Sequence, residues 1–497
     1  MAVPAAPKLH EARGSETLPD DRLSPAVPLR PADAALLERL TAALGPEAVR
    51  PPEPRYLEEP RGRYHGRAAA VLRPGTTAAV ATAVRLCAEA RVGIVPYAGG
   101  TGLVGGQLLE EGPLPVVLSV ERLNRVRDLD LTDNLLIAEA GCILADVQAA
   151  ARDAGRLFPL SLASEGSARI GGLLGTNAGG VAVLRYGNAR DLCLGVEAVM
   201  ADGSVLAGVG RLVKDNMGYD LRHLLIGSEG TLAIITAASL RLFPRPGEIA
   251  TAWIGVPSPA VALELLRAMR DALGGTLSAF ELIDVTGLDF LAATMPQVPL
   301  PPAMGTGWRV LVEATDAVGA GLAERIEAVL AAAIDEGLAT DALVAQSGAQ
   351  RDSFWTVRES IPEANRLVGA INSQDISLPP SRLAAFIDAA RAAVAAIDPA
   401  IRINCFGHLG DGNLHYNLYP PKGASRSAYE GVRAPLKETL HDLTNAMGGS
   451  VSAEHGVGRL KTGDLVRYLD PARVAAMRAI KAALDPQGIL NPGAVLA

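Results

Sequence analysis

The chain has 497 residues and a net charge of −8, and 49% of its residues are hydrophobic. This length predicts two or three folded units, each large enough to bury its own core. The acidic balance argues against a nucleic-acid partner, because phosphate binding needs concentrated lysine and arginine. No apolar run is long enough for a transmembrane segment.

Residues 1–30 are rich in proline, serine and acidic residues, and they lack the basic flank and apolar core of a signal peptide. They predict a flexible tail on a cytoplasmic protein. The cysteines are scattered in sequence without a CxxC pair, so we expect reduced core thiols at Cys87, Cys142, Cys193 and Cys405.

Helical periodicity begins at residue 31, and from residue 71 short Val, Leu and Ile runs alternate with an Ala-rich helical stretch. This strand–helix–strand pattern predicts a first domain over residues 31–246, ending at the turn residues 244–247. A second domain over residues 247–460 alternates helices and strands, which predicts an α+β sheet with helices over one face. Residues 461–497 form a C-terminal segment.

Residues 96–106 (PYAGGTGLVGG) follow a strand-like run and contain five glycines. Such a backbone passes close to a ligand and turns its N–H groups inward, which suits a pyrophosphate. The acidic residue of a Rossmann fingerprint is missing from the following segment. The pattern therefore predicts a phosphate-bearing cofactor outside the Rossmann class, and the alternative is an ordinary glycine-rich loop.

Two further glycine-rich stretches follow, residues 164–180 (SEGSARIGGLLGTNAGG) and residues 224–236 (LLIGSEGTLAIIT). The second places a Gly-Ser-Glu-Gly turn before a buried strand. Three such turns in one domain favour a ligand over a plain loop, and two of the stretches could enclose one long cofactor from opposite sides.

Residues 401–418 (IRINCFGHLGDGNLHYNL) contain a hairpin turn signal between two strand-like runs. His408 would end one strand and His415 would open the next, so the two imidazoles could meet across the hairpin. Asn417 would share a strand face with His415 because side chains alternate. Residues 452–461 (SAEHGVGRLK) add the neighbours Glu454 and His455.

Two imidazoles and one carboxylate suit Zn²⁺ or Mn²⁺ and leave coordination positions open for substrate oxygens. The residues alone leave open whether Glu454 or His455 binds the ion. The alternative is a set of core histidines with ordinary hydrogen-bond partners.

With these motifs in order from residue 45 to the C-terminus, the chain resembles the vanillyl-alcohol-oxidase-type FAD enzymes, in the D-lactate, D-2-hydroxyglutarate and glycolate dehydrogenase branch. The resemblance implies an α+β fold with a two-subdomain FAD-binding domain and an antiparallel-sheet substrate domain with helices. The active site would lie where the domains meet, and residues 461–497 would return to the FAD domain. FAD would be non-covalent, since residues 96–106 contain neither His nor Cys.

The resemblance also implies which residues contact FAD. They are Pro96, Ala98, Gly99, Gly100, Thr101, Gly102, Leu103 and Gly106 at the pyrophosphate, Ser161, Ser164, Gly171, Gly172, Thr176, Asn177 and Gly179 at the ring and ribityl chain, Glu229, Gly230 and Ile234 at the adenine side, and Asn491 near the flavin.

By the same resemblance His408, His415 and Glu454 bind a divalent metal, Zn²⁺ or Mn²⁺. Asn417 contacts the substrate, and His455 is the base that takes the hydroxyl proton. Arg358 binds the substrate carboxylate, for which a bidentate guanidinium is suited; the alternative is an arginine on a helix surface. Together these roles predict oxidation of a D-2-hydroxy acid, of the D-2-hydroxyglutarate or D-lactate type, to the 2-oxo acid.

Two positions depart from the 2-hydroxyglutarate pattern: Pro362 replaces a threonine and Ser373 a lysine. Loss of the lysine weakens the case for a dicarboxylate, and Asn372, Ser373 or Gln374 could hydrogen-bond a less charged tail.

The expected partners are a small 2-hydroxy acid and, by resemblance alone, an electron-transfer flavoprotein or a quinone as electron acceptor. A homodimer is compatible with the sequence. The alternatives are the flavin subunit of a multi-subunit glycolate oxidase, a zinc hydrolase with a nucleotide-binding domain, and a nucleotide sensor without catalysis.

Overall fold

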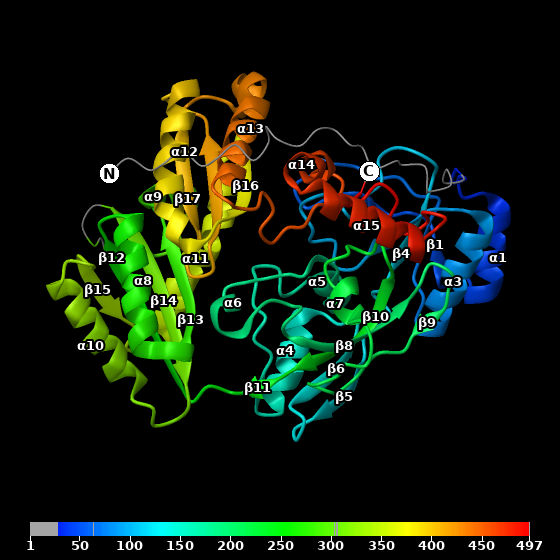
Figure 1. Cartoon of the computed structure of the whole chain (residues 1–497), viewed down its shortest axis with the longest axis horizontal. Coiled ribbons are helices and arrows are strands. Elements are labelled where there is room, and N and C mark those ends of the chain that lie inside the picture. Colours follow the sequence, from blue (N-terminus) through cyan, green and yellow to red (C-terminus); the bar gives the residue numbers. More distant parts are fainter. Residues whose placement is uncertain (1–27, 63, 303, 305–306, 497) are drawn as a thin grey trace.

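The computed structural model describes residues 28–62, 64–302, 304 and 307–496, so most of the predicted tail, residues 1–27, lies outside the described residues. The chain forms two halves that lie side by side (Figure 1). The first half runs to residue 246 and the second half from 247 to 460. The last strand of the first half, β11 (Phe243–Pro244), is followed by the first strand of the second, β12 (Glu248–Val256).

The first half contains two sheets, as the α+β class predicts. The smaller has the order β1-β2-β4-β3, with β2, β4 and β3 parallel. Its elements are β1 (Val49–Arg50), β2 (Ala70–Leu72), β3 (Ile94–Tyr97), β4 (Val116–Ser119), α1 (Ala34–Leu44), α2 (Pro54–Leu57) and α3 (Thr77–Ala90).

The larger sheet of the first half is antiparallel, with the order β5-β6-β10-β8-β9. Its strands are β5 (Val126–Asp130), β6 (Leu135–Glu139), β8 (Cys193–Val199), β9 (Val205–Leu206) and β10 (Ile234–Arg241), accompanied by α4 (Leu144–Asp153), α5 (Ile170–Thr176), α6 (Val183–Tyr186) and α7 (Leu221–Leu225), while β7 (Arg156–Leu157) pairs with β11. A turn that contains Asp202 and Gly203 joins β8 to β9.

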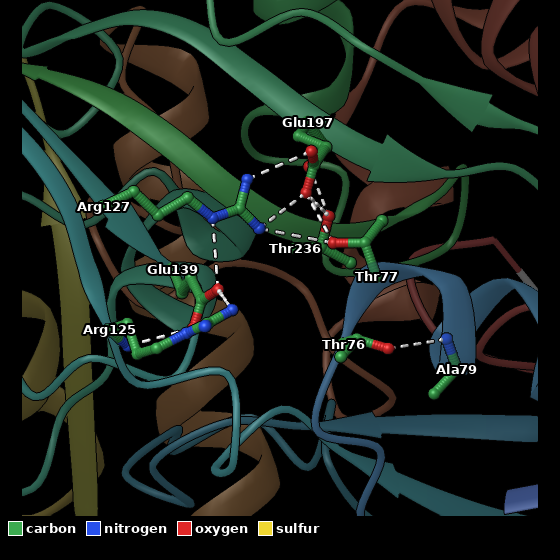
Figure 2. A network of polar contacts seen from close by, with 8 residues as sticks. All are labelled: Thr76, Thr77, Ala79, Arg125, Arg127, Glu139, Glu197 and Thr236. Atoms are coloured by element: carbon green, nitrogen blue, oxygen red, sulfur yellow. Dashed lines mark hydrogen bonds and ion pairs between the residues drawn. The ribbon is translucent and has the colours of Figure 1, made fainter.

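An ionic network joins helix α3 to the larger sheet of the first half (Figure 2). Arg127 of β5 bonds to Glu139 of β6 at 3.1 Å and to Glu197 of β8 at 3.0 Å. Glu197 also accepts from the hydroxyls of Thr77, at 2.6 Å, and Thr236, at 2.8 Å. Because Thr77 begins α3, the network ties the smaller sheet's helix to the larger sheet.

The second half contains one antiparallel sheet of seven strands, in the order β15-β12-β14-β13-β17-β18-β16. The predicted hairpin is confirmed as the pair β17–β18. The remaining strands and helices of this half are β13 (Leu277–Ile283), β14 (Trp308–Asp316), β15 (Asp341–Val344), β16 (Asn372–Ser377), β17 (Arg402–His408), β18 (Asn413–Tyr419), α8 (Pro259–Leu273), α9 (Val285–Thr294), α10 (Leu322–Asp335), α11 (Gly348–Val368), α12 (Leu383–Ile397) and α13 (Glu430–Ala446).

Helices cover both faces of this sheet, so the expectation of helices over one face was wrong. One face packs against α8, α10, α12 and α13, with Leu265 and Phe386 in its apolar core. The opposite face packs against α9 and α11 through a smaller core that includes Phe290 and Phe354. The smaller core leaves part of the second face to polar residues, and the candidate site lies there.

The end of the chain returns to the first half, where α14 (Thr462–Tyr468) and α15 (Pro471–Leu484) lie across it (Figure 1). The backbone of Ile94 in β3 accepts from Asn491 and donates to Ile489. The amine of Lys481 donates to the carbonyls of Thr231 and Leu490, both at 2.8 Å.

The four cysteines are buried and unpaired, as predicted for core thiols. Within the described ranges, no helix combines the length and apolar character needed to cross a membrane.

Candidate metal and cofactor site between the two halves

Strand register places the polar residues of the site on one face of the seven-stranded sheet. Glu281 of β13 lies opposite His408 of β17, and Asp375 of β16 lies opposite His415 of β18. Phe406 of β17 also pairs with His415, which keeps the two histidines on the same face. Four neighbouring strands thus supply two carboxylate–imidazole pairs, one from β13 and β17 and one from β16 and β18.

His408 is held by a carboxylate that the sequence analysis missed. Its Nδ1 lies 2.7 Å from Glu281 Oε1, and both side chains are buried. Burial disfavours charge on both groups, but Arg358 and His408 hold the pKa of Glu281 at about 2. Burial also opposes protonation of His408, yet Glu281 raises the pKa of that imidazole to about 9. With Nδ1 engaged, Nε2 is the nitrogen left to bind an ion, and an ion bound there would displace the Nε2 proton.

His408, His415 and Glu454 form the predicted cluster, with one ligand atom from each within 4.8 Å of the others. His415 Nε2 lies 3.5 Å from Glu454 Oε1, and His408 Nε2 lies 4.0 Å from Glu454 Oε2. Ligands of a tetrahedral zinc ion lie about 3.3 Å apart, so this donor set fits a divalent ion after a small movement. Burial lowers the pKa of His415 to about 4, which leaves that imidazole neutral for coordination.

Asp375, a second carboxylate that the sequence analysis did not identify, contacts His455. One Asp375 oxygen accepts from the backbone N–H groups of Glu454, at 3.1 Å, and His455, at 3.0 Å, and lies 3.1 Å from His455 Nδ1. The other accepts from Asn413 Nδ2 at 3.0 Å. Asp375, Glu454 and His455 also lie within metal-binding distance of one another, but these bonds already occupy Asp375.

Arg358 lies on α11 and is 5% exposed, so the alternative of a surface arginine was wrong. Its Nε donates to Glu281 at 2.7 Å, and its guanidinium lies over the ring of Phe406. Within the part of the chain that the structure describes, no partner bonds to its Nη atoms. One carboxylate therefore holds Arg358 and His408 side by side.

Strand alternation on β16 separates the three residues proposed to contact a substrate tail. Ser373 pairs with Asn417 on the face that carries His415. Gln374 is buried on the opposite face, where its Oε1 lies 2.7 Å from His441 Nε2 of α13, and Asn372 donates to the Arg433 carbonyl of the same helix. Of the three, only Ser373 faces the site.

The glycine-rich stretches of the first half meet at Ala98 and Gly99. A Cβ on Gly99 would lie 2.4 Å from the Ser167 carbonyl, and one on Gly172 would lie 3.0 Å from the Ala98 methyl. In contrast, Gly166 and Gly175 have nothing within 4 Å of an added Cβ. This backbone-lined surface fits a long phosphate-bearing cofactor, because it offers N–H groups and little side-chain bulk.

The other predicted cofactor residues lie around these contacts. Pro96 lies next to Gly230, and the Gly102 carbonyl accepts from the Gln107 side chain. Thr176 and Asn177 lie at the end of α5, the Ser161 carbonyl accepts from the Val181 N–H, and Ile234 begins β10. The remaining predicted residues belong to the same two glycine-rich stretches: Gly100, Thr101, Leu103, Ser164 and Gly171.

Two predicted cofactor residues have their side chains engaged by the protein itself. The Glu229 carboxylate accepts from the backbone N–H groups of Val457, at 2.7 Å, and Gly458, at 2.8 Å. The Asn491 amide donates to the carbonyls of Gly106 and Glu229. A contact of either residue with FAD stays a prediction.

The two groups of residues meet at Gly179. A Cβ on this glycine would lie 3.5 Å from the Oε2 atom of Glu454, a member of the candidate metal-binding cluster. The glycine-rich stretch of the first half therefore lies beside the histidine–glutamate cluster of the second.

Comparison with known proteins identifies the family of the chain. A model described as FAD binding domain matches residues 68–208, and one described as FAD linked oxidases, C-terminal domain, matches residues 245–495. The chain is 37% identical to the mitochondrial D-2-hydroxyglutarate dehydrogenase of Bos taurus, over 93% of this chain and 82% of that protein. It is 36% identical to the D-2-hydroxyglutarate dehydrogenase of Xanthomonas citri pv. viticola, over 85% and 88% respectively.

A solved structure of p-cresol methylhydroxylase with substrate bound superposes with a TM-score of 0.72 at 16% identity, covering 94% of this chain and 98% of that one. At this identity the likeness concerns the fold. The family models and the relatives show that the chain belongs to the FAD-linked oxidases, and its fold is that of p-cresol methylhydroxylase.

Proposed function

We propose that the chain oxidises a D-2-hydroxy acid, of the D-2-hydroxyglutarate or D-lactate type, to the 2-oxo acid with the help of FAD and a divalent metal ion. Relatives named D-2-hydroxyglutarate dehydrogenase support the reaction class. The observation that carries the proposal is the close approach of Gly179 to Glu454, where an added Cβ would lie 3.5 Å from the carboxylate. It brings a metal-binding carboxylate to the stretch expected to line the flavin.

His408, His415 and Glu454 would hold the ion, which would supply Lewis acidity to the substrate hydroxyl and carboxylate. Two imidazoles and one carboxylate leave coordination positions open, as a site that binds substrate needs. Arg358 presents its Nη atoms next to His408, where they can pair with a substrate carboxylate. The protein thereby orients the carbon that carries the hydroxyl.

His455 would take the hydroxyl proton at Nε2. A carboxylate at Nδ1 keeps the ring proton on that nitrogen and leaves Nε2 as an acceptor, which is how a buried aspartate orients a catalytic histidine. Asp375 occupies this position, 3.1 Å from His455 Nδ1. The role of ligand therefore suits Glu454 and the role of base suits His455, a choice that the sequence left open.

When bound, FAD would supply the hydride-accepting chemistry, with an electron-transfer flavoprotein or a quinone as the expected electron acceptor. Residues 96–106 and 164–180 would hold it through backbone N–H groups. Ser373, paired with Asn417, offers a hydroxyl to the distal end of the substrate.

The test is a substrate panel with the purified full-length chain. We expect a yellow protein whose flavin is bleached by a D-2-hydroxy acid, with D-lactate, D-malate and D-2-hydroxyglutarate compared with and without chelator. Equal rates with L-isomers, or activity indifferent to chelation, would contradict the proposal. The variant His455→Asn should lose turnover while it retains FAD and metal.

Two alternatives are addressed by the same material. The match to FAD-linked oxidases argues against a zinc hydrolase and a nucleotide sensor. Turnover by the isolated chain with an artificial dye would argue against a flavin subunit that works only in a complex.

A further inference from the structure

Residues 452–460, which we call the strap, carry Glu454 and His455 between the two halves. The strap is bonded to the second half through Asp375, which accepts from the N–H groups of Glu454 and His455. It is bonded to the first half through Glu229, which accepts from those of Val457 and Gly458. Both halves therefore determine where Glu454 and His455 lie.

Arg459 of the strap binds the glycine-rich loop directly. Its Nη1 donates to the carbonyls of Gly105, at 3.0 Å, and Gly106, at 2.9 Å. Its Nη2 donates to Asn491 Oδ1, at 2.7 Å, and to the Pro492 carbonyl, at 2.8 Å. A planar guanidinium can serve four fixed acceptors on two segments, whereas a lysine amine cannot reproduce that geometry.

The backbones of the strap and the loop are in close contact. Gly458 has φ +51°, and an added Cβ would lie 2.1 Å from the Val104 carbonyl. Gly456 has φ +80°, and its Cβ would lie 2.6 Å from Glu229 Oε1. Because no side chain separates Gly458 from Val104, a shift of the loop end requires a shift of the strap.

We propose that Arg459 and Glu229 couple cofactor binding to metal binding. FAD fixes the glycine-rich loop, the loop holds the strap through Arg459, and the strap sets Glu454 against His408 and His415. This inference rests on the proposed function, since it takes the loop as the FAD site and the cluster as the metal site. Coupling is reciprocal, so the ion also tightens FAD binding. Arg459 is thus a positioning residue that acts through Glu454.

The experiment is a Mn²⁺ titration of the purified full-length chain, FAD-loaded and FAD-stripped. We expect the loaded protein to bind Mn²⁺ about tenfold more tightly, within the usual range for coupled sites. Arg459→Met should bind FAD more weakly, and its two Mn²⁺ affinities should become equal. Arg459→Lys should restore part of the difference.

The matched control is Arg222→Met. Arg222 also donates to two backbone carbonyls, those of Cys193 and Leu194, but both lie within the first half. This variant should keep the wild-type ratio of Mn²⁺ affinities. In the wild type, amide exchange at Val457 and Gly458 should slow when FAD is added; in Arg459→Met it should not.

Equal Mn²⁺ affinities in the wild type with and without FAD overturn the inference, even if Arg459→Met does not fold. The inference is also overturned if folded Arg459→Met keeps the wild-type ratio of Mn²⁺ affinities with and without FAD. If turnover is sensitive to chelator but FAD does not change the Mn²⁺ affinity, the inference is wrong and the proposed function stands. If FAD changes the Mn²⁺ affinity but no D-2-hydroxy acid is oxidised, the proposed function is wrong and the coupling stands.

Discussion

At the scale of single residues, the buried carboxylates Glu281 and Asp375 each contact the Nδ1 of one histidine. Glu281 orients His408 and Asp375 orients His455. Each leaves an Nε2 directed toward Glu454, at 4.0 Å from His408 and 3.9 Å from His455. The two histidines thus have similar partners but different proposed tasks, coordination and proton transfer.

Replacing Glu281 with glutamine should weaken metal binding about 10- to 100-fold, because the partner that fixes the ligating imidazole loses its charge. Chelator competition measures the metal affinity. The control is Glu313→Gln, since Glu313 is also a buried carboxylate of this sheet but bonds to Thr251, Arg351 and Trp355. An equal loss of affinity in both variants would mean that general damage to the sheet is the cause.

Replacing Asp375 with asparagine should lower kcat about 100- to 10,000-fold, the usual contribution of a general base. The new amide would face Nδ1 as a donor and shift the histidine proton to Nε2. Stopped-flow bleaching of the flavin measures the step directly. Unchanged kcat with bound FAD and metal would rule out this role for Asp375.

The sequence predicted the histidine–glutamate cluster because histidine is rare in this chain and two short motifs contain three of the seven. It could not predict Glu281, because the contact with His408 joins residues 127 positions apart. Such a contact depends on the register of strands that are not neighbours in sequence. A carboxylate within an apolar strand was the one available signal, and β13 contains it in LSAFELI.

At the scale of elements, local sequence predicted the β17–β18 hairpin and the glycine-rich turns. It did not predict that helices cover both faces of the seven-stranded sheet. Every residue of β13 is buried. A strand buried on both faces shows no alternation of polar and apolar residues, so its pattern cannot reveal how many layers cover it. The helices α9 and α11 were therefore unpredictable as a second layer.

The network around Glu197 gives a stability prediction. Burial opposes its ionisation, but Arg127, Thr77 and Thr236 lower its pKa overall. A lowered folded-state pKa stabilises the protein above the unfolded value of about 4.3, and the contribution is lost as pH falls through the folded value. We expect Glu197→Gln to cost about 1–3 kcal/mol at pH 7, since the network loses its charged acceptor.

Thermal melts at pH 7 and near pH 3 measure this difference. The difference in melting temperature between wild type and Glu197→Gln should be smaller at the lower pH. The exposed Glu264→Gln on α8 serves as control and should melt like the wild type at both values. If the difference in melting temperature does not depend on pH, the loss of stability comes from packing and not from ionisation of Glu197.

At the scale of the whole molecule, the order of the halves could be predicted but their contact could not. Glycine-rich and histidine-rich segments were each recognisable, yet nothing in sequence showed Gly179 against Glu454. That contact depends on how two folded units dock. Arg185 contributes to the docking by donating from α6 to the Thr315 hydroxyl of β14, at 2.6 Å.

Removing residues 485–497 should abolish FAD retention. Ile489 and Asn491 bond to the backbone of Ile94, next to the glycine-rich loop, and the Asn491 amide bonds to the Gly106 carbonyl. The flavin absorbance of the purified truncated chain, relative to its protein absorbance, measures the effect, and Asn491→Ala should show an intermediate loss. A truncated chain with a full complement of flavin would contradict the prediction.

The return of Asn491 to β3 also has a consequence for biosynthesis. Synthesis proceeds at about 5–20 residues per second, so roughly 20–80 s pass between the synthesis of Ile94 and that of Leu490. During that interval the edge of β3 lacks its bridge to Leu490. A nascent chain that has not yet reached Leu490 should therefore be unable to retain its prosthetic group, and maturation should begin only after that residue has emerged.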